Sequence, residues 1–128
     1  MYYKIKTSGE FDGKQQIKTF LTEGENFAEA AQKVINVIGT EPEIEDIALM
    51  KNFKPAINDQ YDSFNKLYMV KIAEDQINEK GVEKLVKYVL PAFANNSDEL
   101  HKIVNDYISQ GLHGMRLTTI SETKWIYI

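Results

Sequence analysis

The alternation of apolar and polar positions predicts that the chain opens with a β-hairpin. Residues 2–7 and 15–22 each alternate with the period of a half-buried strand, and turn residues that include Gly9 and Gly13 separate them. The side of the hairpin that we expect to be buried comprises Tyr3, Ile5, Thr7, Ile17, Thr19 and Leu21. The opposite side comprises Tyr2, Lys4, Lys6, Lys18, Phe20 and Thr22.

A helix and a third strand are predicted after this hairpin. Asn26 is a favourable N-cap residue, Glu29 completes the spacing of a capping box, and Gly39 stands where helices commonly end. The apolar stripe of the helix comprises Phe27, Ala30, Ala31, Val34, Val37 and Ile38. The third strand is expected over residues 43–53, where an irregular apolar phase allows a β-bulge.

The same succession is predicted again after a loop-like connector over residues 54–66. Strands are expected at 67–73, 83–90 and 115–128, and a second helix follows Asn96, with Glu99 as its capping partner. The stripe of this helix comprises Leu100, Ile103, Val104, Tyr107, Ile108 and Leu112. The expected buried side of the two strands before it comprises Tyr68, Val70, Ile72, Val86, Tyr88 and Leu90, and the other side Leu67, Met69, Lys71, Lys87 and Val89.

The two halves align with each other, which predicts an internal duplication. Residues 3–6 align with 68–71, 18–21 with 87–90 and 44–51 with 117–124, and the two Asn caps coincide. We therefore predict an α+β protein with a duplicated ββαβ repeat, about 1–57 and 66–128, in a single domain spanning 1–128. The expected architecture is a mostly antiparallel six-stranded sheet with both helices on one face.

Composition narrows the class of protein. The 128 residues carry a net charge of -4 and no cysteine, which excludes disulfides, thiol catalysis and thiolate metal sites. The N-terminal residues enter a strand pattern without a signal peptide, and no apolar run is long enough to span a bilayer. A cytoplasmic location and no membrane association are expected.

Lysines interleaved with rings on the predicted open side of the sheet favour single-stranded nucleic acid as a partner, because lysines bind phosphates and rings stack on bases without sequence preference. The expected contacts are Tyr2, Lys4, Lys6, Lys18, Phe20, Lys71 and Lys87. Arg116 is the only arginine, so sequence-specific reading of bases is not expected.

The same side also carries apolar residues, which suggest a different function. An interaction patch of Phe20, Leu67, Met69 and Val89 is typical of a protein–protein module, a host-factor binder or inhibitor, or a homodimer. A third interpretation is that these lysines and apolar residues form an ordinary solvated face with no partner.

No motif in the sequence predicts catalysis, a metal or a cofactor. The two histidines, His101 and His113, lack a nearby carboxylate pattern, and an enzyme would need a pair such as His113 with Glu79. The acidic stretch at 41–46 lacks the glycine and ligand spacing of a calcium loop. Neither a nucleophile elbow nor a glycine-rich phosphate loop is present. We therefore expect a binding module that is not an enzyme.

Three segments carry a resemblance to a known family: Tyr3–Lys6, Leu67–Lys71 and Ile120–Lys124. Together they resemble a family of small uncharacterised proteins, a domain of unknown function, of Bacteroidota and their phages and mobile elements. The resemblance covers nearly the whole chain and departs from the pattern in the second helix and after Thr123. It implies a phage or bacterial cytoplasmic setting but no site residue. Phage accessory proteins often bind nucleic acid or host proteins, which leaves both partner classes open.

Overall fold

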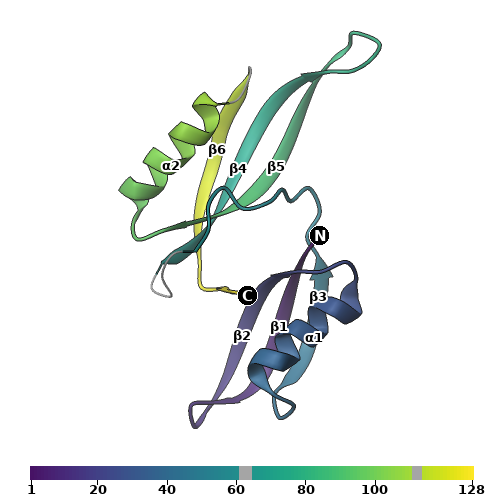
Figure 1. The fold of residues 1–128 in the computed structure, drawn as a ribbon, viewed down its shortest axis with the longest axis vertical. Coiled ribbons are helices and arrows are strands. Elements are labelled where there is room, and N and C mark those ends of the chain that lie inside the picture. The colour runs from purple at the N-terminus through teal and green to yellow at the C-terminus, as the bar shows by residue number, and fades with distance from the viewer. Residues whose placement is uncertain (61–64, 111–113) are drawn as a thin grey trace. The chain divides into compact units, whose positions relative to one another are not determined.

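The chain folds into two compact units, each with its own sheet and one helix across one face of that sheet (Figure 1). A computed structural model describes residues 1–60, 65–110 and 114–128. Unit 1 consists of Met1–Lys51 and Lys124–Ile128, and unit 2 consists of Asn52–Thr123. Gly111, Leu112 and His113, as well as Asp62 and Ser63 of the predicted connector, lie outside the described residues.

Unit 1 contains four strands in the order β3-β1-β2-β7. Its elements are β1 (Tyr2–Phe11), β2 (Lys14–Glu23), α1 (Phe27–Ile38), β3 (Glu43–Leu49) and β7 (Ile126–Tyr127). The central strand β1 pairs antiparallel with β2 and β3, and β7 pairs parallel with β2. The core between the sheet and α1 comprises Tyr3, Ile5, Phe20, Ala30 and Val34.

Unit 2 contains three strands in the order β5-β4-β6, all antiparallel to their neighbours. Its elements are β4 (Lys66–Ile77), β5 (Glu83–Ala94), α2 (Ser97–Ser109) and β6 (Met115–Thr123). The core comprises Tyr68, Val70, Ile72, Tyr88, Leu90, Ala92, Ala94, Leu100 and Val104. This confirms the predicted buried side of β4 and β5, because five residues of that side are buried in one core with Leu100 and Val104 of α2, and Val86 packs against that core.

The α+β class is confirmed, but the strands form two sheets where the sequence predicted a single six-stranded one. Two boundaries explain the difference. The third strand ends at Leu49, and Phe53 instead forms a parallel bridge with Val89 of unit 2. The final strand ends at Thr123, and β7 pairs with β2 of unit 1. At both places the chain passes from one unit to the other. The sequence had predicted a continuing strand or a loop there.

Both helices begin at the predicted asparagine caps. The Asn26 side chain accepts a hydrogen bond from the Glu29 backbone N–H at 2.8 Å, and Asn96 accepts one from Glu99 at 2.9 Å. Each asparagine has extended backbone angles, so its amide satisfies an N–H group that lacks a partner within the helix. Gly39 ends α1 with φ of 81° and donates its N–H to the Ile35 carbonyl.

The allowed bulge in the third strand is confirmed, and a second one occurs in unit 2. The register of β3 against β1 shifts between Lys6 and Thr7, which leaves Glu45 without an opposite residue. The register of β6 against β4 shifts between Lys71 and Ile72, which leaves Thr118 unpaired in the same way. The two bulges therefore follow the two lysines that the sequence alignment matched.

The predicted sides of β2 are wrong. Phe20 lies opposite Ile5 and is 2% exposed, so it belongs to the core beneath α1, and Leu21 lies opposite Lys4 on the other side. Residues directly opposite in a ladder share a face, and a one-residue slip exchanges the two faces. The sequence alignment matched Leu21 with Leu90. The spacing from Asn26 to Asn96 instead matches Phe20 with Leu90, which lies opposite Val70.

The buried stripe of α1 is narrower than predicted. Ala30 and Val34 are fully buried, whereas Phe27 is 50% exposed and Val37 is also exposed. In α2, Leu100 and Val104 are buried as predicted, and Ile103, Tyr107 and Ile108 pack at the margin of the core. A helix over a sheet of few strands buries only its central residues, which leaves its flanks open to partners.

We expect Phe20→Ala to lower the free energy of unfolding by about 3–4 kcal/mol, because it leaves a cavity beneath α1. Ile17→Ala serves as the control. Ile17 is 63% exposed, and its replacement is expected to change stability by less than about 0.5 kcal/mol. Urea unfolding followed by circular dichroism measures both. A larger loss from Ile17→Ala would restore the opposite assignment of the faces of β2.

The environment of Tyr88 leads us to expect that the protein loses stability at alkaline pH. Burial raises the pKa of the Tyr88 hydroxyl, and the hydrogen bond that it donates to Glu74 at 3.0 Å adds to the increase. Because the folded-state pKa lies above the unfolded value of about 10, the stabilisation is complete below that pH and is lost as pH rises through the folded pKa. The free energy of unfolding should therefore fall more steeply above pH about 10 in the natural chain than in Tyr88→Phe. Equal slopes in urea unfolding would contradict this.

Candidate functional site

The outer strand β3 presents a free backbone edge. Among the strands of the described residues, β1 is its one neighbour, so one row of its N–H and C=O groups points away from the sheet. The Met50 N–H donates to the Tyr2 carbonyl at 2.9 Å, which fixes the alternation of the ladder. The backbone groups of Ile47 and Leu49 consequently face outward. This is the geometry that accepts an additional strand.

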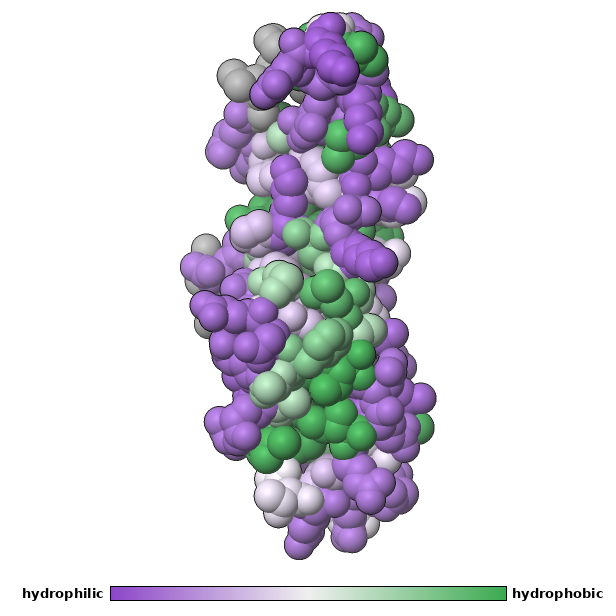
Figure 2. Space-filling model, turned by 90° about the vertical axis from the view of Figure 1, so that its right-hand side faces the viewer, coloured by the Kyte–Doolittle hydropathy of each residue, from purple (hydrophilic) through white to green (hydrophobic). Residues whose placement is uncertain are grey.

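An apolar surface lies beside this edge on the side that α1 covers. Ile44, Ile47 and Leu49 lie opposite Thr7, Ile5 and Tyr3 on that side of the sheet. The Phe27 ring meets Tyr3 edge-on at 5.0 Å between centroids. Figure 2 shows apolar surface gathered over this unit, in the lower half of the view. We define the β3–α1 patch as Phe27, Ile38, Ile44, Ile47 and Leu49.

The members of the β3–α1 patch remain partly open to solvent. Phe27 is 50% and Leu49 is 38% exposed, and Ile38, Ile44 and Ile47 are half-buried against the core. Several exposed apolar side chains next to an unpaired backbone edge are characteristic of interaction sites on otherwise polar proteins. The patch offers side-chain contacts where the edge offers hydrogen bonds.

The opposite side of β3 is acidic. Glu43 and Asp46 lie across from Ser8 and Lys6 on the side away from α1, and Glu45 occupies the bulge between them. Lys6 forms an ion pair with Glu45 at 3.9 Å, and both side chains are about half exposed, so the pair contributes little to stability. The edge of β3 thus combines an apolar side with an acidic side.

The structure does not assemble the predicted nucleic-acid platform in unit 1. Tyr2 is 5% exposed and Phe20 is 2% exposed, so neither ring is available to stack under a base. Lys18 lies on the α1 side, opposite Thr7, with its Nζ over the Phe11 ring at 4.5 Å. Lys4 and Lys6 do share the other side, and Lys4 Nζ lies 4.9 Å from the centre of the Trp125 ring. Phe20 is buried because the predicted phase of β2 was wrong, whereas Tyr2 lies on the predicted side of β1 with Lys4 and Lys6 and is buried there.

In unit 2 the predicted lysines do come together. Lys87 and Arg116 lie on either side of Ala73, across three adjacent strands, and Lys71 is the next residue of β4 on the same side. We call Lys71, Lys87 and Arg116 the basic cluster; all three are exposed, and Arg116 is 3.5 Å from Asp75. Phe53 lies on the same side, because it pairs with Val89, which is opposite Lys71.

Sequence reasoning missed Arg116 and Phe53 as neighbours of the lysines. Arg116 reaches them through the register of β6 against β4, which no local pattern reveals. Phe53 had been assigned to the end of the third strand, and only its bridge to Val89 brings it to this face. The sequence did contain one signal for this cluster. Lys71 and Lys87 each occupy the set of alternating positions that was predicted to face outward in their own strand.

The predicted interaction patch is divided between the units. Phe20 lies in the core of unit 1, and Leu67 is 4% exposed in unit 2. Met69 and Val89 are half-buried on the side of the unit 2 sheet that faces away from α2. These residues therefore do not form the continuous exposed surface that was predicted, whereas the β3–α1 patch is an apolar surface that accompanies a free edge.

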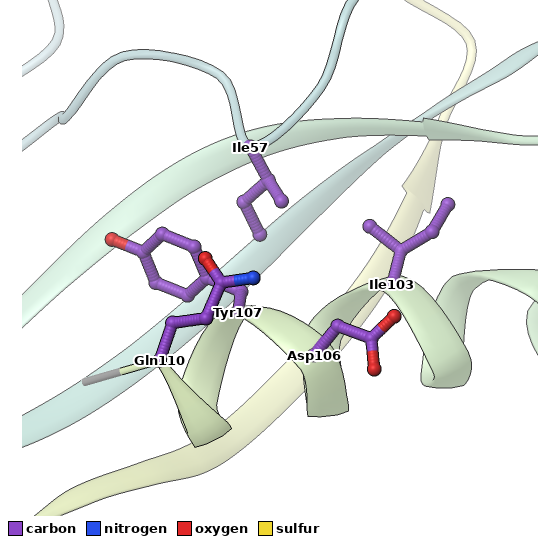
Figure 3. Close-up of a pocket in the computed structure, with 5 residues that line it drawn as sticks. All are labelled: Ile57, Ile103, Asp106, Tyr107 and Gln110. Carbon is purple, nitrogen blue, oxygen red and sulfur yellow. The ribbon is translucent and has the colours of Figure 1, made fainter.

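A small pocket lies between α2 and the segment before β4 in unit 2. It has a volume of about 210 Å³, and Figure 3 shows Ile57 pointing toward α2, which contributes Ile103, Asp106, Tyr107 and Gln110. The described residues of its lining combine apolar and polar groups.

The described part of the chain also holds no candidate metal site. Across residues 1–60, 65–110 and 114–128, no group of three or more His, Asp or Glu side chains is arranged to hold a metal ion. The exposed ring of His101 bonds through Nδ1 to the Ser97 carbonyl at 2.7 Å within α2. The suggested pairing of His113 with Glu79 lies outside the described residues.

Comparison of this chain with family models, with curated proteins and with solved structures finds no match. The resemblance to the Bacteroidota and phage family therefore stays a prediction. Among the described helices, neither is long and apolar enough to cross a membrane. The site is accordingly interpreted from its own geometry.

Proposed function

We propose that this protein is a protein-binding module that captures an extended segment of a partner on the edge of β3. The observation that carries the proposal is the free β3 edge beside the exposed β3–α1 patch. A partner strand gains main-chain hydrogen bonds from the edge, and its alternate side chains gain contacts on the two sides of the sheet. Neither gain requires a catalytic residue or a cofactor.

The two sides of β3 specify the chemistry of the partner segment. Side chains that fall on the α1 side would pack on Ile47 and Leu49, and those on the other side would face Glu43 and Asp46. Opposite charges across neighbouring strands stabilise the pair, and like charges destabilise it. The proposed partner is therefore an extended segment that alternates apolar residues with Lys or Arg.

We further propose that the two units are copies of one ββαβ repeat that have diverged in their outer strands. The asparagine caps, the bulges and the strand orders β3-β1-β2 and β6-β4-β5 correspond. The positions that hold Glu45 and Asp46 in β3 correspond to Thr118 and Thr119 in β6. An acidic edge is thus particular to unit 1, which supports its assignment as the partner-binding edge.

A short synthetic peptide that alternates lysine with valine tests the proposal. We expect it to shift the backbone amide signals of Ile47 and Leu49 in a nuclear magnetic resonance titration, because those groups face the added strand. A peptide that alternates glutamate with valine should not bind. Binding should weaken with salt, since the charges are exposed.

The matched variants are Glu43→Lys with Asp46→Lys, and Glu79→Lys with Glu83→Lys, which change net charge equally. The first pair should weaken binding about tenfold, because two attractive cross-strand contacts become repulsive. The second pair lies in unit 2 and should leave the affinity unchanged. An equal loss of affinity in both variants would mean that the interaction depends on net charge alone. The absence of a shift in the amide signals of Ile47 and Leu49 would refute strand addition.

The basic cluster of unit 2 favours a second candidate function, the binding of single-stranded nucleic acid. Lys71, Lys87 and Arg116 share one sheet face with Phe53, which combines phosphate contacts with a ring. Fluorescence anisotropy of a labelled oligonucleotide should show binding that falls with salt. Lys71→Glu with Lys87→Glu should abolish it, whereas Lys14→Glu with Lys33→Glu should not. Binding that survives the first pair would exclude this face.

A further inference from the structure

Each unit is completed by a segment that follows the outer strand of the other. Lys124–Ile128 comes directly after β6 of unit 2 and closes the edge of β2 in unit 1. The segment that follows β3 of unit 1 runs along β5 of unit 2, where Phe53 pairs with Val89. The chain therefore exchanges two closing segments, and neither sheet is closed by residues of its own ββαβ stretch.

The closing segment of unit 1, which we call the tail (residues 124–128), fits a specific groove. Ile126 and Tyr127 pair with Phe20 and Leu21, and the Ile128 N–H donates to the Leu21 carbonyl at 3.1 Å. The buried Thr22 hydroxyl donates to the Ile128 carbonyl at 3.2 Å. These contacts fix the direction and register of the tail along β2.

Side chains of the tail contribute on both sides of the sheet. Ile128 packs against the core beneath α1, and Ile126 lines a pocket of about 320 Å³ with Phe20 and Val37. On the other side, the Trp125 ring lies beneath Lys4 Nζ. The groove thus reads alternate residues of the tail, as a strand-binding site does.

The edge of β5 that the segment after β3 occupies corresponds to the groove on β2, but it contains a proline. The Val89 N–H donates to the Asn52 carbonyl, and the Lys54 and Ile57 N–H groups donate to Val89 and Pro91. Pro91 occupies the position in β5 that Leu21 occupies in β2, and it has no N–H to offer. The docked segment therefore uses both backbone groups of Val89 but only the carbonyl of Pro91. A proline is therefore compatible with this strand position, but it cannot donate a backbone hydrogen bond to a strand docked there.

We infer that the tail is exchangeable between molecules, and that the groove on β2 accepts the tail of a second copy of this chain. The occupant is identified by the structure itself, because the sequence seated in the groove is the one that a second copy also carries. Only Lys124 and Trp125 join β6 to β7, so opening the chain at these two residues frees the tail and removes only Ile128 from the margin of the unit 1 core. Exchange of an identical element is a low-cost route to dimers.

In dilute solution the tail occupies the groove of its own molecule, which we call the cis contact. A tail on a short tether has a high effective concentration at its own groove, so a second copy competes only when protein is concentrated or the cis contact is blocked. This makes the exchange a concentration-dependent interaction and separates it from partner binding at β3, on which it does not depend.

Two full-length variants test the inference by complementation. Ile126→Asp with Ile128→Asp disables the tail and leaves the groove intact. Leu21→Pro disables the groove, because the Leu21 N–H faces β7 rather than β1, and Pro91 shows that proline fits this strand position. Native mass spectrometry of the mixture should show a one-to-one heterodimer, and neither variant alone should dimerise.

The control replaces the Leu21→Pro copy with a copy that carries all three substitutions, and it should give only monomers. Isotope labelling of the tail-disabled copy provides a second readout. Its Phe20 and Leu21 amide signals should return toward their natural positions when the Leu21→Pro copy is added. If the tail-disabled copy is unfolded alone, recovery of its circular dichroism on mixing supports exchange. Monomers only, or no recovery, would overturn the inference.

Discussion

The register of β2 against β1 is the constraint on which the remainder of unit 1 depends. With Phe20 opposite Ile5, the largest side chain of β2 lies beneath α1 and Leu21 faces the other side. That register also directs the Leu21 backbone groups toward β7, so it prepares the groove for the tail. Because side chains alternate with a period of two, a slip of one residue would exchange every one of these roles.

Closure of the β2 edge by the tail determines which edge of the unit 1 sheet can accept another strand. The tail occupies the outer edge of β2, which leaves β3 as the free edge of the unit 1 sheet. Its acidic side chains and its bulge at Glu45 oppose indiscriminate pairing, as charges and bulges do on natural edge strands. Under the proposed function, the same features select a segment with basic residues on the matching side.

The two units illustrate how one arrangement supports different surfaces. The caps and bulges fix where helices begin and where outer strands bend, and these features recur at corresponding positions. On the sides of the outer strands that face away from the helices, the side chains lie outside both cores, and there the two units differ. Unit 1 presents carboxylates beside apolar residues, and unit 2 presents hydroxyl groups together with a basic cluster.

The sequence by itself determined the features that depend on local interactions. The asparagine caps, the alternation of β4 and β5, the irregular third strand and the α+β class all follow from near neighbours in the chain. Tertiary structure decided the side of β2, the separation into two sheets, and the meeting of Arg116 and Phe53 with Lys71. In β2 both alternating sets are part apolar, so only pairing with β1 selects one. The exchanged segments depend on backbone hydrogen bonds between distant strands, and backbone groups leave no trace in residue type.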